Sequence, residues 1–160
     1  MIRVQQQDFD VGAEIAALTD GKHGIGGVVS FVGLVRDMAP VEGSDTKIGA
    51  MTLEHYPGMT EKQLVEIERE ANARWPLEAS LIVHRYGRLE PGARIVLVVC
   101  ASAHRQDAFD ACNFLIDWLK TQAPFWKLEE TGEGDLWVEA RDTDDAAAAR
   151  WQASRDDAAE

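Results

Sequence analysis

The stretch that decides the fold runs over residues 102–127 and reads SAHRQDAFDACNFLIDWLKTQAPFWK. Its apolar residues recur at spacings of one, three and four, which predicts a helix with one buried face. Ser102 is the expected N-cap, so His104 and Arg105 would lie in the first turn. The buried face is expected to consist of Ala108, Phe109, Cys112, Leu115, Ile116 and Leu119.

Both ends of this helix carry positive charge. Pro124 prevents the helix from continuing, which places Lys120 in the last turn and Lys127 just beyond it. A lysine at a helix C-terminus is electrostatically ordinary, whereas Arg105 lies where the helix dipole is already positive. A cation beside free backbone N–H groups is most reasonable where an anion binds between them. The sequence therefore predicts an anion site at the start of this helix.

Length and composition limit the possible classes of protein. The 160 residues suffice for one domain with a hydrophobic core, expected at residues 1–151, ahead of an acidic tail at 152–160. A formal net charge of −12 argues against nucleic acid or an anionic membrane surface as a partner. No apolar stretch has the length of a signal peptide or a membrane span. Cys100 and Cys112 have apolar neighbours, so we expect two buried thiols in a reducing cytoplasm.

The segments around the long helix predict an α+β fold. The run at 94–101 is apolar on both faces, so it is expected at the centre of a sheet, next to a strand at 81–86. The strand at 48–56 is expected to pair with the strand at 27–36. We predict a mostly antiparallel sheet with two main helices packed on one face. The expected order is a helix at 9–18, strands at 27–36 and 48–56, a helix at 60–75 capped by Thr60 and Gln63, strands at 81–86, 94–101 and 136–141, and a helix from 143.

Six basic or imidazole side chains stand at the ends of these elements, where folds usually carry their sites. Taken singly, each is most simply a solvated surface group. The apolar neighbours of the two lysines favour a functional role for them, because a lysine held against an aromatic surface can act as an acid, a base or a nucleophile. The six are Arg36, His104, Arg105, Lys120, Lys127 and Arg141.

Other chemistries fit the sequence less well. The four histidines are scattered without metal-ligand spacing. No GxSxG motif marks a serine nucleophile, although a Ser-His-Asp arrangement stays open. Cysteines buried on apolar faces are poor nucleophiles. The glycine-rich segment 22–27 precedes a strand rather than a helix, so we interpret it as a turn and not as a nucleotide loop. We predict no metal and no cofactor.

The length of the central helix limits which of the six residues can share a site. Arg105 and Lys120 are fifteen residues apart, or roughly 22 Å along a continuous helix. One small metabolite would not reach both ends within a single chain. A two-fold dimer is the simplest solution, in which His104 and Arg105 of one subunit complete the pocket of the other.

Several motifs together resemble those of one family, the catalytic (large) subunits of molybdopterin synthase. The resemblance covers residues 27–151 and implies an α/β hammerhead-type fold and a homodimer. SAHR alone would mean little, whereas the combination is specific. The motifs are VVSFVGLVRD, TLEHYPGMTEKQL, RWPL, VHRYGRLEPG, SAHRQDAF, DWLKTQAPFWK and GDLWVEAR.

The resemblance implies an activity in molybdenum cofactor biosynthesis. Such an enzyme converts cyclic pyranopterin monophosphate into molybdopterin by installing two dithiolene sulfurs. The sulfur would arrive as a thiocarboxylate at the C-terminal Gly-Gly of a small ubiquitin-like subunit, which with the homodimer gives a heterotetramer. The residues suit this chemistry, because arginine and lysine bind anionic phosphate and carboxylate groups and a positioned lysine transfers protons. No cysteine of this chain is required, since the partner carries the sulfur.

The resemblance also assigns residues, position by position. Lys120 and Lys127 match the catalytic and substrate-contacting lysines of the family. Leu34 departs from the pattern, because relatives often carry a polar or basic residue there, so only a backbone contact is expected from it. The other expected substrate contacts are Val35, Arg36, His104, Arg105, Leu128, Glu129 and Arg141.

Two non-catalytic functions stay open on the sequence. An adaptor would only dock a ubiquitin-like tail, and its Lys120→Ala variant would lose partner binding rather than turnover. A small-anion-binding module would take a phosphate-bearing ligand without any partner protein.

Overall fold

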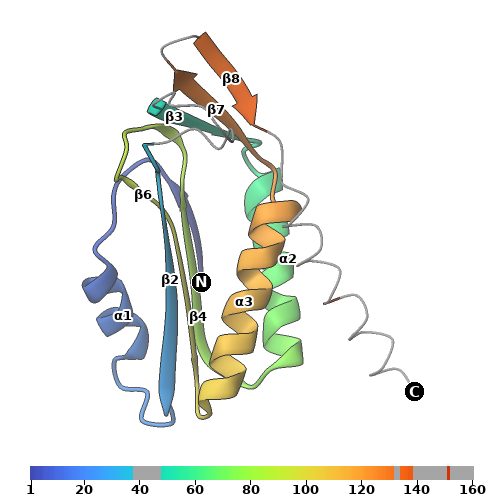
Figure 1. Ribbon diagram of the computed structural model, residues 1–160. Helices are drawn as coiled ribbons and strands as arrows, with labels where there is room; N and C mark the ends of the chain where they lie inside the picture. Colours follow the sequence, from blue (N-terminus) through green and yellow to red (C-terminus); the bar gives the residue numbers. More distant parts are fainter. Residues whose placement is uncertain (38–47, 132–133, 139–150, 152–160) are drawn as a thin grey trace.

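The computed structural model describes residues 1–37, 48–131, 134–138 and 151, and its elements confirm the α+β class. Helices α2 and α3 lie on one face of a long sheet and the short α1 lies on the other (Figure 1). The helices are α1 (Val11–Thr19), α2 (Met59–Arg74) and α3 (Arg105–Thr121). The strands are β1 (Ile2–Gln5), β2 (Gly27–Leu34), β3 (Ile48–His55), β4 (Leu77–Arg85), β5 (Gly87–Leu89), β6 (Arg94–Ser102), β7 (Phe125–Thr131) and β8 (Gly134–Val138).

Strand β6 lies inside the first sheet, whose strand order is β1-β4-β6-β2. This confirms the central position predicted from its two apolar faces. Val98 and Cys100 pack against residues of α2 and α3, whereas Leu97 and Val99 pack on the side of α1. All four side chains are fully buried. Because side chains alternate along a strand, one apolar run supplies the core on both faces of the sheet.

The second sheet has the order β5-β3-β7-β8 and lies across one end of the first (Figure 1). The predicted pairing of the strand at 48–56 with the strand at 27–36 is therefore wrong. Strand β3 pairs with β5 and β7, and β2 pairs with β6. The physical reason is that a strand with two apolar faces is buried in the middle of a sheet, where both of its edges hydrogen-bond to neighbouring strands. Strand β4 pairs with one edge of β6 and β2 pairs with the other.

Three described strands, β1, β5 and β7, were not predicted from the sequence. Strand β1 has four residues and β5 has three, which is too short for a periodic pattern. Strand β7 reads FWKLEET and mixes aromatic, charged and polar residues. Its extended form depends on antiparallel pairing with β3 on one side and β8 on the other.

The helix at the centre of the sequence pattern is α3, and it begins slightly later than predicted. Its N-cap is His104 rather than Ser102. The Ser102 hydroxyl instead donates a hydrogen bond to the Pro76 carbonyl at 2.9 Å, because Ser102 is still the last residue of β6. The predicted end is confirmed, since α3 stops at Thr121, ahead of Pro124.

One residue of the predicted buried face of α3 is exposed. Phe109 is 51% exposed, whereas Ala108, Cys112 and Leu115 are buried. The apolar stripe on this helix is thus wider than the surface that the first sheet covers. The Phe109 ring therefore leaves apolar surface exposed on this side of α3.

The start of α2 also differs from the prediction of a Thr60–Gln63 capping box. The N-cap is Gly58, whose N–H donates to the Glu61 carboxylate at 2.6 Å. Gly58 has a φ of 82°, a left-handed conformation that favours glycine. Thr60 is fully buried, and its hydroxyl hydrogen-bonds to the backbone of Tyr56.

Some predictions fall outside the described residues. They are the loop at 38–47, the last strand residues 139–141, the helix from 143 and the tail at 152–160, so the division of the chain at 151 stays a prediction. Trp151 is described, and its ring packs edge-on against Trp75 and Phe114. In the part of the chain that the structure describes, no helix combines the length and the apolar character that crossing a bilayer requires.

Candidate functional site

Four rings connect the two sheets at the end where β4 meets β7. His84 in β4 stacks on Phe125, the first residue of β7, with ring centroids 3.6 Å apart and planes inclined by 13°. His55, the last residue of β3, has its ring centroid 4.5 Å from that of Tyr86 and 6.1 Å from that of Phe125. We term these four residues the ring cluster. It holds the start of β7 against the first sheet.

Lys127 lies on the inner face of the second sheet. Side chains alternate along a strand, so Lys127 shares its face of β7 with Phe125 and Glu129, while Leu128 is on the opposite face. Its cross-strand neighbour is Leu53, which is 1% exposed. Lys127 itself is half-buried and Glu129 is buried. The lysine stem therefore starts from an apolar surface, the apolar cluster of Val35, Met51, Leu53 and Leu89.

The end of β2 brings Arg36 to the same apolar cluster. Arg36 is exposed and follows Val35, which is 3% exposed. The Val35 N–H donates to the Ala93 carbonyl at 2.9 Å, and the Val35 carbonyl accepts from the Gly92 N–H at 2.8 Å. Val35 thus anchors Arg36 and has no spare N–H for a ligand. Leu34, one residue earlier, is 52% exposed.

Lys120 lies exposed in the last turn of α3, and a short link joins it to β7. The Gln122 N–H donates to a carbonyl of the last turn at 2.8 Å. Pro124 then turns the chain into the strand that carries Lys127. The end of α3, the start of β7 and the end of β2 lie at one end of the molecule, where the second sheet crosses the first (Figure 1). Lys120, Lys127 and Arg36 belong to these segments by their positions in the chain.

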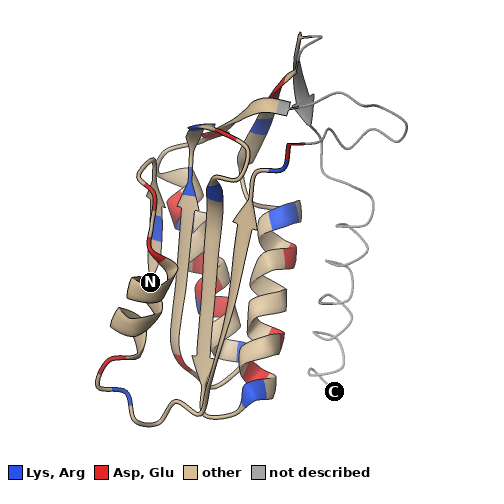
Figure 2. Cartoon of the chain, turned by 60° about the vertical axis from the view of Figure 1, so that its left-hand side comes forward, with Lys and Arg blue, Asp and Glu red and all other residues tan. Residues whose placement is uncertain are grey.

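His104 and Arg105 lie at the opposite end of α3. Both are exposed, and Arg105 is fifteen residues from Lys120, or roughly 22 Å along the helix. Figure 2 shows basic residues at both ends of α3 and acidic residues between them. The start of β2 runs beside this end, because a Cβ placed on Gly27 would lie 3.6 Å from the Arg105 Cα. One chain therefore does not bring all the predicted residues together, and Arg141 lies outside the described residues.

Burial determines the charge of the ring cluster. Removal from water lowers the pKa of His84 to about 4; the hydrogen bond with the Arg85 carbonyl opposes this shift, and the electrostatic effects of Lys127 and His55 add to it. The His84 Nδ1 lies 2.9 Å from the Arg85 carbonyl oxygen. A carbonyl can only accept, so Nδ1 carries the proton and Nε2 is bare. His84 is consequently a neutral ring at pH 7.

Neither a cysteine nucleophile nor a metal site is supported by the residues that the structure describes. Cys100 and Cys112 are free, and both are buried as predicted. A hydrogen bond with Cys112, together with burial, raises the pKa of Cys100, and a thiol that stays protonated is a poor nucleophile. Among the described residues, no group of three or more His, Cys, Asp or Glu side chains could hold a metal ion.

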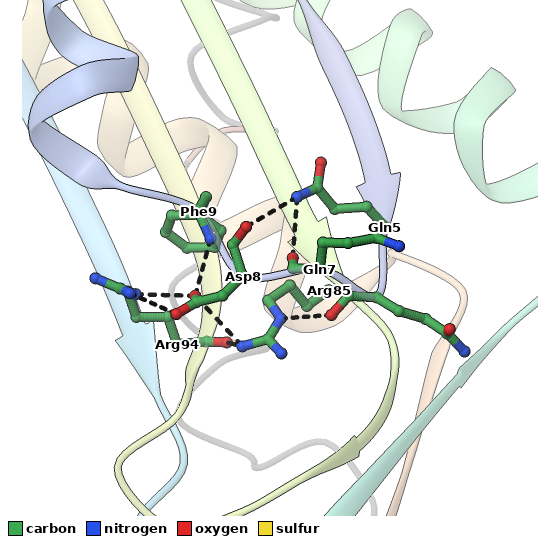
Figure 3. A network of polar contacts seen from close by, with 7 residues as sticks. Gln5, Gln7, Asp8, Phe9, Arg85 and Arg94 are labelled. Atoms are coloured by element: carbon green, nitrogen blue, oxygen red, sulfur yellow. Dashed lines mark hydrogen bonds and ion pairs between the residues drawn. The ribbon is translucent and has the colours of Figure 1, made fainter.

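A polar network ties the chain between β1 and α1 to the ends of β4 and β6 (Figure 3). Asp8 accepts from the Arg94 Nε at 2.9 Å and from the Arg85 Nη1 at 3.4 Å. Arg85 also donates through Nε to the Gln6 carbonyl at 2.9 Å. The hydrogen bond from Arg94 is the main cause that lowers the pKa of Asp8 to about 2. Both arginines are engaged in holding this segment, so we assign the network to the scaffold.

Sequence reasoning missed the ring cluster. Its closest ring contact joins His84 to Phe125. These two residues lie far apart in the chain, so no local pattern predicts the pair. The available signal was His84 itself, a titratable side chain within the otherwise apolar run LIVH. A polar side chain in a buried strand needs a partner. His84 has two: its ring stacks on Phe125, and its Nδ1 hydrogen-bonds to the Arg85 carbonyl.

Comparisons with known proteins agree over most of the chain. The family model described as MoaE protein matches residues 4–122. A molybdopterin synthase catalytic subunit from Pseudomonas aeruginosa is 60% identical over 151 residues, which cover 94% of this chain and 98% of that protein. A molybdopterin biosynthesis MoaE protein from Burkholderia ambifaria, a solved structure, is 53% identical with a TM-score of 0.79, over 95% of this chain and 97% of that one. A complex of subunits 1 and 2 of the molybdopterin-converting factor from Helicobacter pylori shares the fold at 19% identity, with a TM-score of 0.70 over 88% of this chain and 91% of that one.

Proposed function

Since this chain belongs to the MoaE family, as a molybdopterin synthase catalytic subunit of molybdenum cofactor biosynthesis, we propose that it converts cyclic pyranopterin monophosphate into molybdopterin. The sulfur would come from the C-terminal thiocarboxylate of a small ubiquitin-like partner. The observation that supports this reaction best is the grouping of Lys120, Lys127 and Arg36 at one end of the molecule. The two-subunit complex from Helicobacter pylori supports the choice of partner.

The charges at this end suit the two reactants, which are both anionic. Arg36 can bind the substrate phosphate through paired N–H donors. Lys120 and Lys127 can hold the thiocarboxylate and stabilise charge that develops at its acyl carbon. In each transfer the sulfur forms a C–S bond to the pterin side chain in place of a C–O bond. Water then cleaves the acyl–sulfur bond, and the partner's tail leaves as a carboxylate.

The other proposed contacts surround these cations. Leu128 and Glu129 continue β7 past Lys127, one on each face of the strand. Leu34 and Val35 lead into Arg36, and a contact from Arg141 rests on the family resemblance. We place the reaction in the cytoplasm, because two free and buried cysteines suit a reducing compartment.

We further propose a homodimer that pairs through the outer edge of β2, which no strand among the described residues covers. This strand is the last in its sheet, and its sequence GVVSFVGL carries no charge. Two copies can therefore approach along it without the like-charge repulsion that a net charge of −12 would otherwise cause. Val28, Leu34 and the nearby helix residue Phe109 are large apolar side chains exposed on the single chain, and the second copy would cover them.

Antiparallel pairing of the two β2 strands would complete the site. Within one chain Arg105 lies beside the start of β2, and Arg36 follows its end. A two-fold axis through the middle of the strand puts the start of one copy beside the end of the other. The eight residues of β2 span about 26 Å, which is close to the length of helix between Arg105 and Lys120. Arg105 of the partner subunit would then approach Arg36 and Lys120.

Turnover with single variants tests the reaction. Purified chain, pterin substrate and thiocarboxylated small subunit should give molybdopterin, and omission of the small subunit should abolish it. We expect Lys120→Ala and Lys127→Ala to retain partner binding and to lose about 100-fold or more in kcat. Arg69→Ala, which removes an exposed cation of α2, serves as the matched control. Loss of partner binding with Lys120→Ala, and no turnover by the unmodified chain, would support the adaptor instead.

Mixing two inactive variants tests the shared site. Each mixed dimer of Arg105→Ala and Lys120→Ala chains contains one complete site and one that lacks both residues. Random exchange makes half of the dimers mixed, so about a quarter of the unmodified activity should return. No recovery in a dimer shown to be mixed by mass spectrometry would refute sharing, and the reaction itself would still stand.

A further inference from the structure

We propose that His84 is a positioning residue for Lys127 and acts through the ring of Phe125, without contacting either reactant. The inference rests on the proposed function only in taking Lys127 as a site residue. It concerns the ring cluster, which the family comparisons and the proposed reaction leave without a role.

His84 is a firm platform because its own strand is held on both sides. It pairs with Val4 of β1 and with Val96 of β6, and only 7% of its surface is exposed. The hydrogen bond from Nδ1 to the Arg85 carbonyl at 2.9 Å fixes the orientation of the ring. A side chain anchored by two neighbouring strands and a hydrogen bond has little freedom to move.

Phe125 transmits this position to Lys127. Its ring lies on that of His84, with centroids 3.6 Å apart and planes inclined by only 13°. Phe125 begins β7 directly after the link from α3, so its ring sets where the strand starts. Lys127 follows two residues later on the same face. Displacing Phe125 would therefore displace the lysine side chain along the same surface.

The positioning role also depends on the electrical neutrality of His84. The groups that face its ring are Lys127 from β7, His55 from β3 and the Arg85 carbonyl from its own strand. A protonated imidazole would place a second positive charge beside Lys127 in a buried setting. Because burial keeps the pKa of His84 near 4, the ring is a neutral surface at physiological pH.

Three variants, with a fourth in reserve, separate positioning from catalysis and from general stability. His84→Phe keeps a flat, neutral ring for Phe125, so its kcat should stay within about threefold of the unmodified enzyme. His84→Ala removes the stack and should lower kcat about tenfold or more, with KM for the pterin changed less than threefold. Val83→Ala is the matched control, because Val83 is fully buried in the same strand but faces the opposite core. It should lower the melting temperature and leave kcat unchanged. His84→Leu keeps the volume without the flat stack and replaces the alanine variant if that one does not fold.

A readout independent of activity follows the lysine itself. Reductive methylation with ¹³C-formaldehyde gives each lysine an NMR signal, and the Lys127→Arg variant identifies the one from Lys127. We expect this signal to move in His84→Ala and to keep its place in His84→Phe and Val83→Ala. An unmoved signal in His84→Ala, or loss of activity in His84→Phe, would overturn the positioning role. A moved signal with full activity would support positioning and refute the part assigned to Lys127 in the proposed function.

Discussion

Replacement of Leu53 by alanine tests the apolar surface from which Lys127 rises. Leu53 is 1% exposed, packs in the apolar cluster and stands opposite Lys127 across the β3–β7 pair. The change removes three buried carbons, worth about 0.8 kcal/mol each as transfer free energy, or roughly 2.4 kcal/mol. The cavity left behind adds to this, so the free energy of unfolding should fall by about 3 kcal/mol. For a chain of this length, the melting temperature should fall by about 6–12 °C.

Urea unfolding followed by circular dichroism measures this loss. The slope of the unfolding free energy against urea should not change, because the exposed surface of the unfolded chain is nearly the same. Val65→Ala is the control: Val65 is 52% exposed on α2, and its truncation should cost less than about 0.5 kcal/mol. A loss below about 1 kcal/mol for Leu53→Ala would show that the cluster is not closely packed. Lys127 would then not rise from a closely packed apolar surface.

Three further outcomes follow from the scaffold. The pKa of Asp8 is lowered in the folded chain, so its carboxylate stabilises the fold above pH 3.8, and this contribution is lost as the pH falls toward 2. The side chain is half-exposed, so Asp8→Asn should lower the free energy of unfolding in urea by under about 1 kcal/mol at pH 7 and by less at pH 3. An equal loss at both pH values would refute the stabilising role of the Asp8 carboxylate. Gly26→Ala should lower the melting temperature by several degrees, because the added Cβ would lie 2.2 Å from the Ala103 carbonyl oxygen. This clash should destabilise the fold by about 2 kcal/mol. An unchanged melting temperature would contradict the close approach of Gly26 to the Ala103 backbone. Cys100 and Cys112 should be inert to a disulfide reagent in native buffer and react in urea, and fast native reaction would show that they are accessible.

The central strand of the first sheet and the helix that follows it could be read directly from the sequence. The helical period that ends before Pro124 and the two apolar faces of 94–101 are local patterns, and both elements form, although α3 begins later than the predicted N-cap Ser102. Pro124 marks the end of α3 for the same reason, since a proline acts on its immediate neighbours. The burial of Cys100 and Cys112 also followed from their apolar neighbours. These features do not depend on which distant segment the element meets.

The candidate site was predictable only in part. The sequence showed which basic residues stand at the ends of elements. The spacing of Arg105 and Lys120 along one helix also showed that these two residues lie far apart within a single chain. The structure agrees with that separation and adds that Arg36 and Lys127 are joined through one apolar cluster. No spacing in the sequence indicated this, because Val35 follows β2 of the first sheet whereas Leu53 lies in β3 of the second.

Long-range pairing accounts for what the local patterns missed. Strand β3 pairs with β7, and the stack of His84 on Phe125 supports the segment that carries Lys127. Each of these joins segments that are dozens of residues apart, and many alternative pairs would satisfy the same local preferences. The choice among them depends on burying both faces of β6 and the inner face of the second sheet at once. That is a property of the assembled core and not of any one stretch of chain.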